Sequence, residues 1–359
     1  MFVDKKLYIA LKMRYTSRAM LQKDGSKNSS EKLACFNETL SHARAFIMGL
    51  AMIAVMFYHG TFGIFLQYGK YIGCYGHWGV DVFLFVSGFG IYYALDKSGG
   101  CGIGCFYSRR IERIIPAALI SGVILYSLGK VGILGLFGMD LWYIRSILII
   151  YLLSPFFYRL LKKYEPARVV VTITLLATVG VLVAVPLQLR NLPAFNTTMC
   201  WTLARLASFV VGMYIAQRNW SIRQVFSGKY ICFCIIALPA LMYVHYLRLV
   251  ENSISTYLHL LPYVALAFCM PFICGVVCKV INFIPGVIRK SVEFFGVYSL
   301  EIYLVHEAVF NTVGNSHMRA SARFIVAYGG SVLLALLLHF VAKNLLKWIK
   351  KAAILRESR

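Results

Sequence analysis

Charged residues are scarce in this sequence, and acidic residues are the scarcest of them. Asp, Glu, Lys and Arg make up 14% of the 359 residues, and only 14 residues are Asp or Glu. A typical soluble domain carries about 25% charged residues, so the composition excludes an ordinary water-exposed surface. Hydrophobic residues account for 60% of the chain. Together these values predict a polytopic helical membrane protein.

The cysteines form no recognisable set of metal ligands or bridges. The ten cysteines are scattered, several of them within apolar runs, without the spacing of a secreted disulfide framework. No arrangement of cysteine pairs and histidines completes a tetrahedral site, so we expect no metal. The GxG patterns lack a strand–helix context and carry no nucleotide-binding signal. We therefore expect no permanently bound cofactor.

Ten apolar runs approach the roughly 20 residues that a bilayer requires. They lie at residues 44–66, 78–95, 114–131, 140–161, 168–188, 200–217, 229–247, 257–280, 294–312 and 324–349. The third and ninth, rich in glycine or polar groups, are the weakest. We expect an all-α bundle of about ten transmembrane helices. Residues 1–43 and 350–359 would form polar and basic cytoplasmic tails, and 44–349 the membrane domain.

The basic residues favour one side of this bundle. Of the 37 Lys and Arg, 29 lie in the terminal segments and the loops after even-numbered runs, and six lie in the other loops. Because cytoplasmic loops are enriched in Lys and Arg, both termini are predicted to be cytoplasmic. This distribution explains the net charge of +23 by membrane orientation, so membrane lipid is an expected partner and nucleic acid is not.

Polar residues inside apolar runs are the candidates for function, because charge within a bilayer is costly. By the predicted topology, those in the outer half are His59, Asp81, Trp142, Arg145, Arg205, His306 and Glu307. His59 follows Arg44 by 15 residues, a helical rise of roughly 22 Å, which places the histidine near the outer face. The cytoplasmic side carries Arg109, Arg110 and Arg113.

His59 is the sharpest candidate for chemistry. Near neutral pH, an imidazole can take a proton from a hydroxyl and return it to a leaving group. A carboxylate such as Asp81 or Glu307 would orient the ring and stabilise its cation. Alternatively, Asp81 would hold the helices together. The alternative is an interfacial histidine that touches lipid headgroups, and the residues alone leave both open. For His306 we expect anchoring at the interface rather than a second catalytic role.

The arginine cluster has two interpretations. Arg110 and Arg113 are three residues apart and share a helical face, so with Arg109 they could clamp phosphate groups. Alternatively, the cluster marks the cytoplasmic end of a span or contacts anionic lipid. Such clusters are common at membrane edges, and on the residues alone the second interpretation is favoured.

Two further arginines, Arg145 and Arg205, lie within predicted spans. They should face the bundle interior, because an unpaired cation in lipid is costly. Each is expected to pair with a carboxylate such as Asp140 or Glu301. The pair could serve stability, or the cation could bind an anionic group.

Three more residues are expected beside the route of a substrate. Ser87, next to Gly88, favours close approach of two helices over a role as nucleophile, since small residues mark helix contacts. Trp142 and Tyr151 could line an acyl route, although aromatic residues at such depths more often serve packing.

Five segments of the chain resemble, in order, motifs of the acyltransferase family 3 integral membrane proteins, which O-acylate surface carbohydrates in many bacteria. They are GLAMIAVMFYH (49–59), GVDVFLFVSGF (79–89), FYSRRIERIIP (106–116), LWYIRSILIIYLLSP (141–155) and YSLEIYLVH (298–306). The resemblance implies a multi-pass protein of the bacterial inner membrane. It implies that acyl-CoA, usually acetyl-CoA, is the donor co-substrate and docks on the cytoplasmic side near Arg110 and Arg113. His59 would catalyse transfer to a sugar hydroxyl on the outer side.

Two positions depart from the family pattern. The family commonly has an arginine eleven residues before the histidine of the first span, where this chain has Met48. Arg44 lies one turn earlier and is a possible substitute. The motif of the fourth span often carries a glutamate five residues after its tryptophan, where this chain has Ile147.

The resulting prediction is a membrane O-acyltransferase that moves an acyl group, most simply acetyl, to a hydroxyl of an envelope polysaccharide or lipid-linked sugar. A transporter is the main alternative. Transporters often contain paired halves, and no convincing repeat relates residues 44–190 to 200–349. A non-catalytic partner in polysaccharide export is a third possibility, suggested by Met48 and Ile147.

Overall fold

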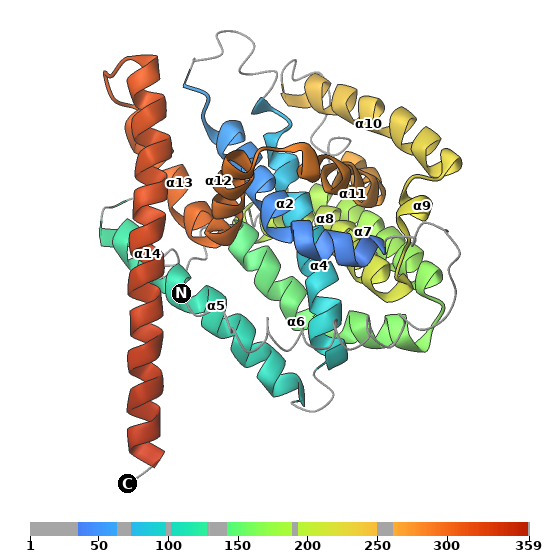
Figure 1. The fold of residues 1–359 in the computed structure, drawn as a ribbon, viewed down its shortest axis with the longest axis horizontal. Helices are drawn as coiled ribbons and strands as arrows, with labels where there is room; N and C mark the ends of the chain where they lie inside the picture. Colours follow the sequence, from blue (N-terminus) through green and yellow to red (C-terminus); the bar gives the residue numbers. More distant parts are fainter. Residues whose placement is uncertain are drawn as a thin grey trace. The chain divides into compact units, whose positions relative to one another are not determined.

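The computed structural model describes residues 35–62, 73–97, 102–127, 129, 142–188, 193–249 and 261–357. These residues belong to one compact unit, Ala34–Arg359. Within the described ranges the fold is helical, and the only bridge between extended residues joins Cys35 to Ser221. Figure 1 shows the arrangement.

The helices carry the labels of Figure 1. In chain order they are α2 (Phe36–His59), η1 (Gly76–Trp78), α4 (Gly79–Lys97), α5 (Gly102–Ser127), α6 (Trp142–Lys163), α7 (Pro166–Gln188), α8 (Pro193–Arg218), α9 (Ile222–Val225), α10 (Gly228–Leu249), α11 (Leu261–Val280), η5 (Ile281–Phe283), α12 (Gly286–Val297), α13 (Ser299–Gly314) and α14 (Ala320–Glu357).

Among the described residues, eight helices are long and apolar enough to cross a membrane: α2, α4 with η1, α6, α7, α8, α10, α11 and α14. The predicted all-helical membrane architecture is therefore confirmed. The two weakest runs, the third and ninth, became α5 and α13 and are not among the eight. Because α13 has only 16 residues, it is short for a full crossing. Ten crossings and cytoplasmic termini stay predictions.

The first helix begins earlier than the apolar run that predicted it. Phe36 starts α2, eight residues before Arg44, and the side chain of Asn37 explains the extension. Its amide donates to the carbonyl oxygens of Ile215 (3.1 Å) and Ala216 (3.2 Å) in α8 and to the Tyr93 hydroxyl in α4 (2.9 Å). Residues 1–34 of the predicted tail lie outside the described residues.

The last helix is longer than its apolar run. α14 has 38 residues, about 57 Å of helix, against a hydrocarbon core of about 30 Å. Two polar contacts join it to its neighbours: His339 Nδ1 lies 2.8 Å from Glu301 in α13, and Lys350 Nζ forms an ion pair with Glu112 in α5 at 2.6 Å. The helix therefore continues through residues 350–357, which the sequence assigned to a tail.

The centre of the bundle is the contact between α4 and α8. In α8, 78% of the span is buried, compared with 17% in the peripheral α10. Gly88 of α4 lies against the backbone carbonyl of Phe209, and Gly212 of α8 lies against that of Phe85, so a Cβ at either glycine would overlap the facing backbone. The expectation that Gly88 permits close helix approach agrees with this geometry.

The predicted ninth span is interrupted. Its sequence forms α12 and α13, which meet at Tyr298. α12 packs on α2 through two more glycines: Gly49 faces the carbonyl of Val292, and Gly296 faces that of Ala45. This contact fixes α12 against α2, and α13 starts separately and lies beside the C-terminal end of α2, where His306 contacts His59.

We predict that Gly88→Ala and Gly212→Ala each lower the free energy of unfolding by about 1–3 kcal/mol, because the added methyl group forces two backbones apart. Thermal unfolding of the detergent-solubilised protein measures the effect. Gly104→Ala is the matched control, since no atom lies within 4 Å of a Cβ at that position in α5. A control as destabilised as the two variants would contradict the close-packing explanation.

Candidate functional site

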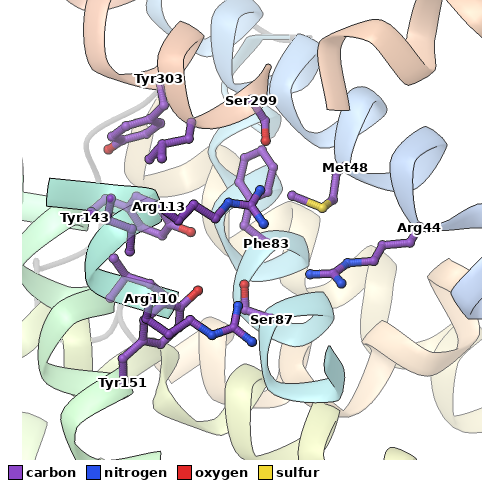
Figure 2. Close-up of a pocket in the computed structure, with 13 residues that line it drawn as sticks. Arg44, Met48, Phe83, Ser87, Arg110, Arg113, Tyr143, Tyr151, Ser299 and Tyr303 are labelled. Atoms are coloured by element: carbon purple, nitrogen blue, oxygen red, sulfur yellow. The ribbon is translucent and has the colours of Figure 1, made fainter. Parts of the chain in front are cut away.

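A cavity between α2, α4, α5, α6 and α13 brings together residues far apart in the sequence (Figure 2). Its lining consists of three arginines, two serines, three tyrosines and apolar side chains. These residues are Arg44, Met48, Phe83, Ser87, Arg110, Arg113, Ile114, Tyr143, Ile147, Tyr151, Ser299, Leu300 and Tyr303. All five helices carry one of the segments that resemble the acyltransferase family or lie directly beside one.

The three arginines approach the cavity from two sides. Arg110 and Arg113 extend from one face of α5, and Arg44 extends from α2 opposite them (Figure 2). The guanidinium of Arg110 lies 5.6 Å from the centre of the Tyr151 ring, which stabilises the cation without neutralising it. Among the described residues, none of the three forms an ion pair with a carboxylate. Three arginines in one cavity, without a carboxylate partner among the described residues, are chemically suited to a polyanion.

The contact between α5 and α6 positions this cluster. Tyr107 donates its hydroxyl hydrogen to the carbonyl oxygen of Leu152 over 2.8 Å, and Ser121 donates to the carbonyl of Leu304 in α13 over 3.2 Å. These bonds hold α5 beside α6 and α13, two of the helices that line the cavity. Arg109 is exposed and is not part of the lining, so only two of the three predicted α5 arginines face the site.

A row of aromatic rings leads from the cavity to His59. The rings of Tyr143 and Tyr303, both in the lining, are 4.9 Å apart. Tyr303 lies 5.4 Å from His306, one helical turn further along α13, and His306 lies 4.8 Å from His59. The structure therefore brings together two predicted residues, His59 and His306, and connects them to the arginine cavity.

His59 ends α2 and is exposed, so its ring is accessible from the end of the bundle that the charge pattern places outside. Glu307, also exposed, is the carboxylate that acts on the ring electrostatically. His306 is only 1% exposed. That burial does not fit the expected interfacial anchor, because a residue that anchors at an interface keeps its polar end in contact with water or headgroups.

Asp81 contacts helix α8 rather than His59. Its Oδ2 lies 3.0 Å from Arg205 Nη1, and its Oδ1 accepts a hydrogen bond from Ser208 over 3.0 Å. Both charged side chains are buried, with 0% and 1% exposed. Because α8 packs against α4, the buried Arg205 side chain of α8 faces Asp81 and forms the ion pair. The contact fits the second of the two roles expected for Asp81, which is to hold the helices together.

Arg205 was expected to pair with Asp140 or Glu301. The prediction of a carboxylate partner is confirmed, but the partner is Asp81; Asp140 lies outside the described residues and Glu301 contacts His339. Three rings enclose the guanidinium: those of Trp142 (5.1 Å), Trp201 (5.3 Å) and Tyr263 (4.3 Å). Trp142 thus packs on the cation and is not part of the cavity lining.

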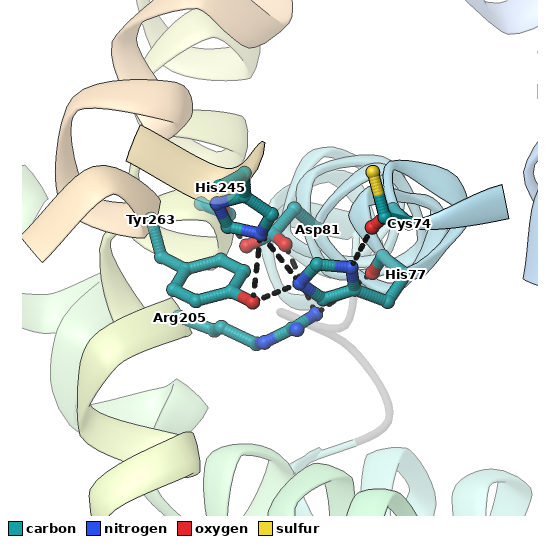
Figure 3. Close-up of polar contacts among 7 residues, drawn as sticks. Cys74, His77, Asp81, Arg205, His245 and Tyr263 are labelled. Carbon is teal, nitrogen blue, oxygen red and sulfur yellow. Dashed lines mark hydrogen bonds and ion pairs between the residues drawn. The ribbon is translucent and has the colours of Figure 1, made fainter. Parts of the chain in front are cut away.

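A histidine pair lies beside this ion pair and was not predicted (Figure 3). The rings of His77 and His245 stack at 4.5 Å, with their Nε2 atoms 2.7 Å apart, and the Tyr263 hydroxyl bonds to His77. Arg205 Nη1 also donates to the backbone carbonyl of His77 over 3.1 Å. The sequence contained no sign of this cluster, because its members come from four separate elements.

Of the remaining predicted residues, some line the arginine cavity and one does not. Ser87 and Tyr151 line the arginine cavity. Arg145 is half-buried at the start of α6, and its Nε has no hydrogen-bond partner among the described residues. Met48 and Ile147, the two departures from the family pattern, both line the cavity. Sequence reasoning missed Tyr303, although its spacing of three residues from His306 places both on one face.

The helices and the site together describe a multi-pass membrane protein with a basic cavity connected to a pair of histidines, an arrangement suited to group transfer from an anionic donor. A family model described as an acyltransferase domain matches residues 47–341. The chain therefore belongs to acyltransferase family 3 and is a membrane acyltransferase of that family. Comparison with curated proteins and with solved structures finds no match.

We predict that Asp81→Ala and Arg205→Ala each cost about 3–5 kcal/mol of stability, because each variant leaves an uncompensated charge in a buried position. Thermal unfolding in detergent would measure this loss. The double variant should lose less than the sum of the two single losses, since the two groups interact directly. An Asp81→Ala protein as stable as the wild type but devoid of activity would instead indicate a catalytic carboxylate.

Proposed function

We propose that this protein is an O-acyltransferase that takes an acyl group, most simply acetyl, from cytoplasmic acyl-CoA and transfers it to a hydroxyl of an envelope carbohydrate. The observation that supports this most is the convergence of Arg44, Arg110 and Arg113 on one cavity without a carboxylate partner among the described residues. A coenzyme A donor carries several phosphate groups, which guanidinium groups bind in bidentate fashion.

The two ends of the site correspond to the two substrates. The charge distribution favours a cytoplasmic position for the arginine end, where acyl-CoA is available. His59 is exposed at the C-terminal end of α2, which the charge pattern assigns to the outside, where the proposed carbohydrate would reach it. The rings of Tyr143, Tyr303 and His306 contact one another in succession between these two ends, and the proposed acyl route follows them. Such a route would let the thioester advance while the nucleotide stays bound to the arginines.

The proposed reaction needs one base. A ring nitrogen of His59 takes the proton of the acceptor hydroxyl while the hydroxyl oxygen attacks the thioester carbonyl carbon. The C–S bond then breaks, and the sulfur of coenzyme A leaves with the proton returned by the imidazolium. The products are an O-acyl sugar and free coenzyme A, and no oxidant, reductant or metal is consumed. The exposed Glu307 carboxylate stabilises the transient cation beside it.

We predict that Arg110→Ala weakens acetyl-CoA binding by roughly 10–100-fold, the equivalent of losing a charge-assisted bond of about 1.5–3 kcal/mol. Calorimetric titration of the purified protein measures the dissociation constant. Arg44→Ala should act in the same direction if its cation contributes to the same site.

The matched control is Arg109→Ala. It removes the same charge from the neighbouring residue, whose side chain is not part of the cavity lining. Its dissociation constant should equal that of the wild type. Equal losses of acetyl-CoA affinity in the Arg109 and Arg110 variants would indicate general attraction by a basic surface. No loss of affinity in either variant would indicate that the cluster serves membrane orientation only.

We predict that His59→Ala abolishes acyl transfer while binding acetyl-CoA with wild-type affinity. The assay supplies radiolabelled acetyl-CoA to inside-out membrane vesicles and measures label in their carbohydrate fraction. A loss of at least about 100-fold is expected for removal of the general base. Transfer at the wild-type rate would exclude His59 as the base, and wild-type vesicles without any labelled carbohydrate would exclude the proposed acceptor class.

A further inference from the structure

His306 combines deep burial with an unused hydrogen-bonding atom. Its Nδ1 lies 3.1 Å from the carbonyl oxygen of Ile302 and 2.9 Å from that of Tyr303. A carbonyl can only accept, so Nδ1 carries the ring proton and Nε2 is left as an unprotonated acceptor. Among the described residues this Nε2 has no hydrogen-bond partner, although it is buried.

Leaving such an atom unpaired costs roughly 1–3 kcal/mol, and polar groups of this kind in native proteins call for an explanation. The ring of His59 supplies one. It lies against His306 in an edge-to-face contact, with ring centres 4.8 Å apart and an interplanar angle of 78°. Rotation of the His59 ring about its soft terminal torsion brings an N–H group toward the free Nε2.

We infer that His306 is a positioning residue for His59: its Nε2 accepts the N–H of the His59 ring and thereby leaves the other His59 nitrogen unprotonated and facing the acceptor hydroxyl. This inference rests on the proposed acyl transfer. The buried histidine would do here what a carboxylate does in many acyl-transfer sites, namely hold the base in the productive tautomer.

The other groups near His59 are less suited to this task. Asp81 is engaged by Arg205 and Ser208. Glu307 is exposed, so water competes for its hydrogen bonds and screens its charge. His306 is fixed at Nδ1 by the α13 backbone and packed between the rings of Tyr303 (5.4 Å) and Phe310 (5.9 Å). A rigid, dry acceptor holds a tautomer more firmly than a mobile solvated one.

Two substitutions at His306 separate hydrogen bonding from packing. His306→Phe keeps a ring against its neighbours and removes the acceptor, whereas His306→Gln removes the ring and keeps an oxygen acceptor near the position of Nε2. We expect the rate at saturating acetyl-CoA to fall on the order of 100-fold in the Phe variant and by less than about tenfold in the Gln variant. The KM for acetyl-CoA should stay unchanged in both.

The vesicle assay described above for His59 measures these rates. A Phe variant that transfers acetyl at a rate equal to or above that of the Gln variant would overturn the inference, because a purely structural ring gives that order. His339→Phe and His339→Gln are the matched controls, since this histidine also contacts α13 through a ring and an Nδ1 bond. Both control variants should transfer at the wild-type rate.

A measurement on the unmodified protein covers the case in which the Phe variant does not fold. Nitrogen-15 spectra of the labelled wild type, with His306 assigned by difference from the Gln variant, report which ring nitrogen carries the proton. A protonated Nδ1 and an unprotonated Nε2 are expected, and a protonated Nε2 would overturn the inference. The result is separate from the proposed function, which fails only if the wild type transfers no acetyl group or His59→Ala transfers it normally.

Discussion

A cation within a bilayer needs a counter-charge or access to water, and the placement of the arginines in this protein follows from that constraint. Arg205 meets it with a buried carboxylate, a backbone carbonyl and three aromatic rings. Arg44, Arg110 and Arg113 meet it with an open cavity. The first solution fixes two helices relative to each other, and the second leaves positive charge available for a ligand.

Both solutions depend on α4. One face of this helix carries Asp81, which receives Arg205, and Gly88, which allows α8 to approach closely. Another face of the same helix carries Phe83 and Ser87, four residues apart, which line the cavity. A shift of α4 against α8 would therefore change the ion pair and the cavity together. The buried ion pair and the cavity therefore both use side chains of this one helix.

The sequence predicted the helical membrane fold, because apolar length and basic loops are strong signals. It also singled out Ser87, Arg110, Arg113 and Tyr151, which line the cavity. It could not predict which residues face one another. α13 is apolar around most of its surface, so nothing in the sequence distinguished a buried His306 from an interfacial one. The sequence left two roles open for Asp81, and only the packing of α4 on α8 shows that its partner is Arg205.

The two departures from the family pattern also become interpretable in three dimensions. The resemblance implies that a basic residue and an acidic residue are common at the positions of Met48 and Ile147, and both positions line the cavity. Replacing one charge of each sign by apolar groups leaves the net charge of the cavity unchanged, and Arg44 extends into the same space from one turn away. The cavity thus keeps the positive charge that the proposed phosphate-rich donor would require. Neither departure lies beside His59 and His306, so the chemistry proposed at that end is independent of them.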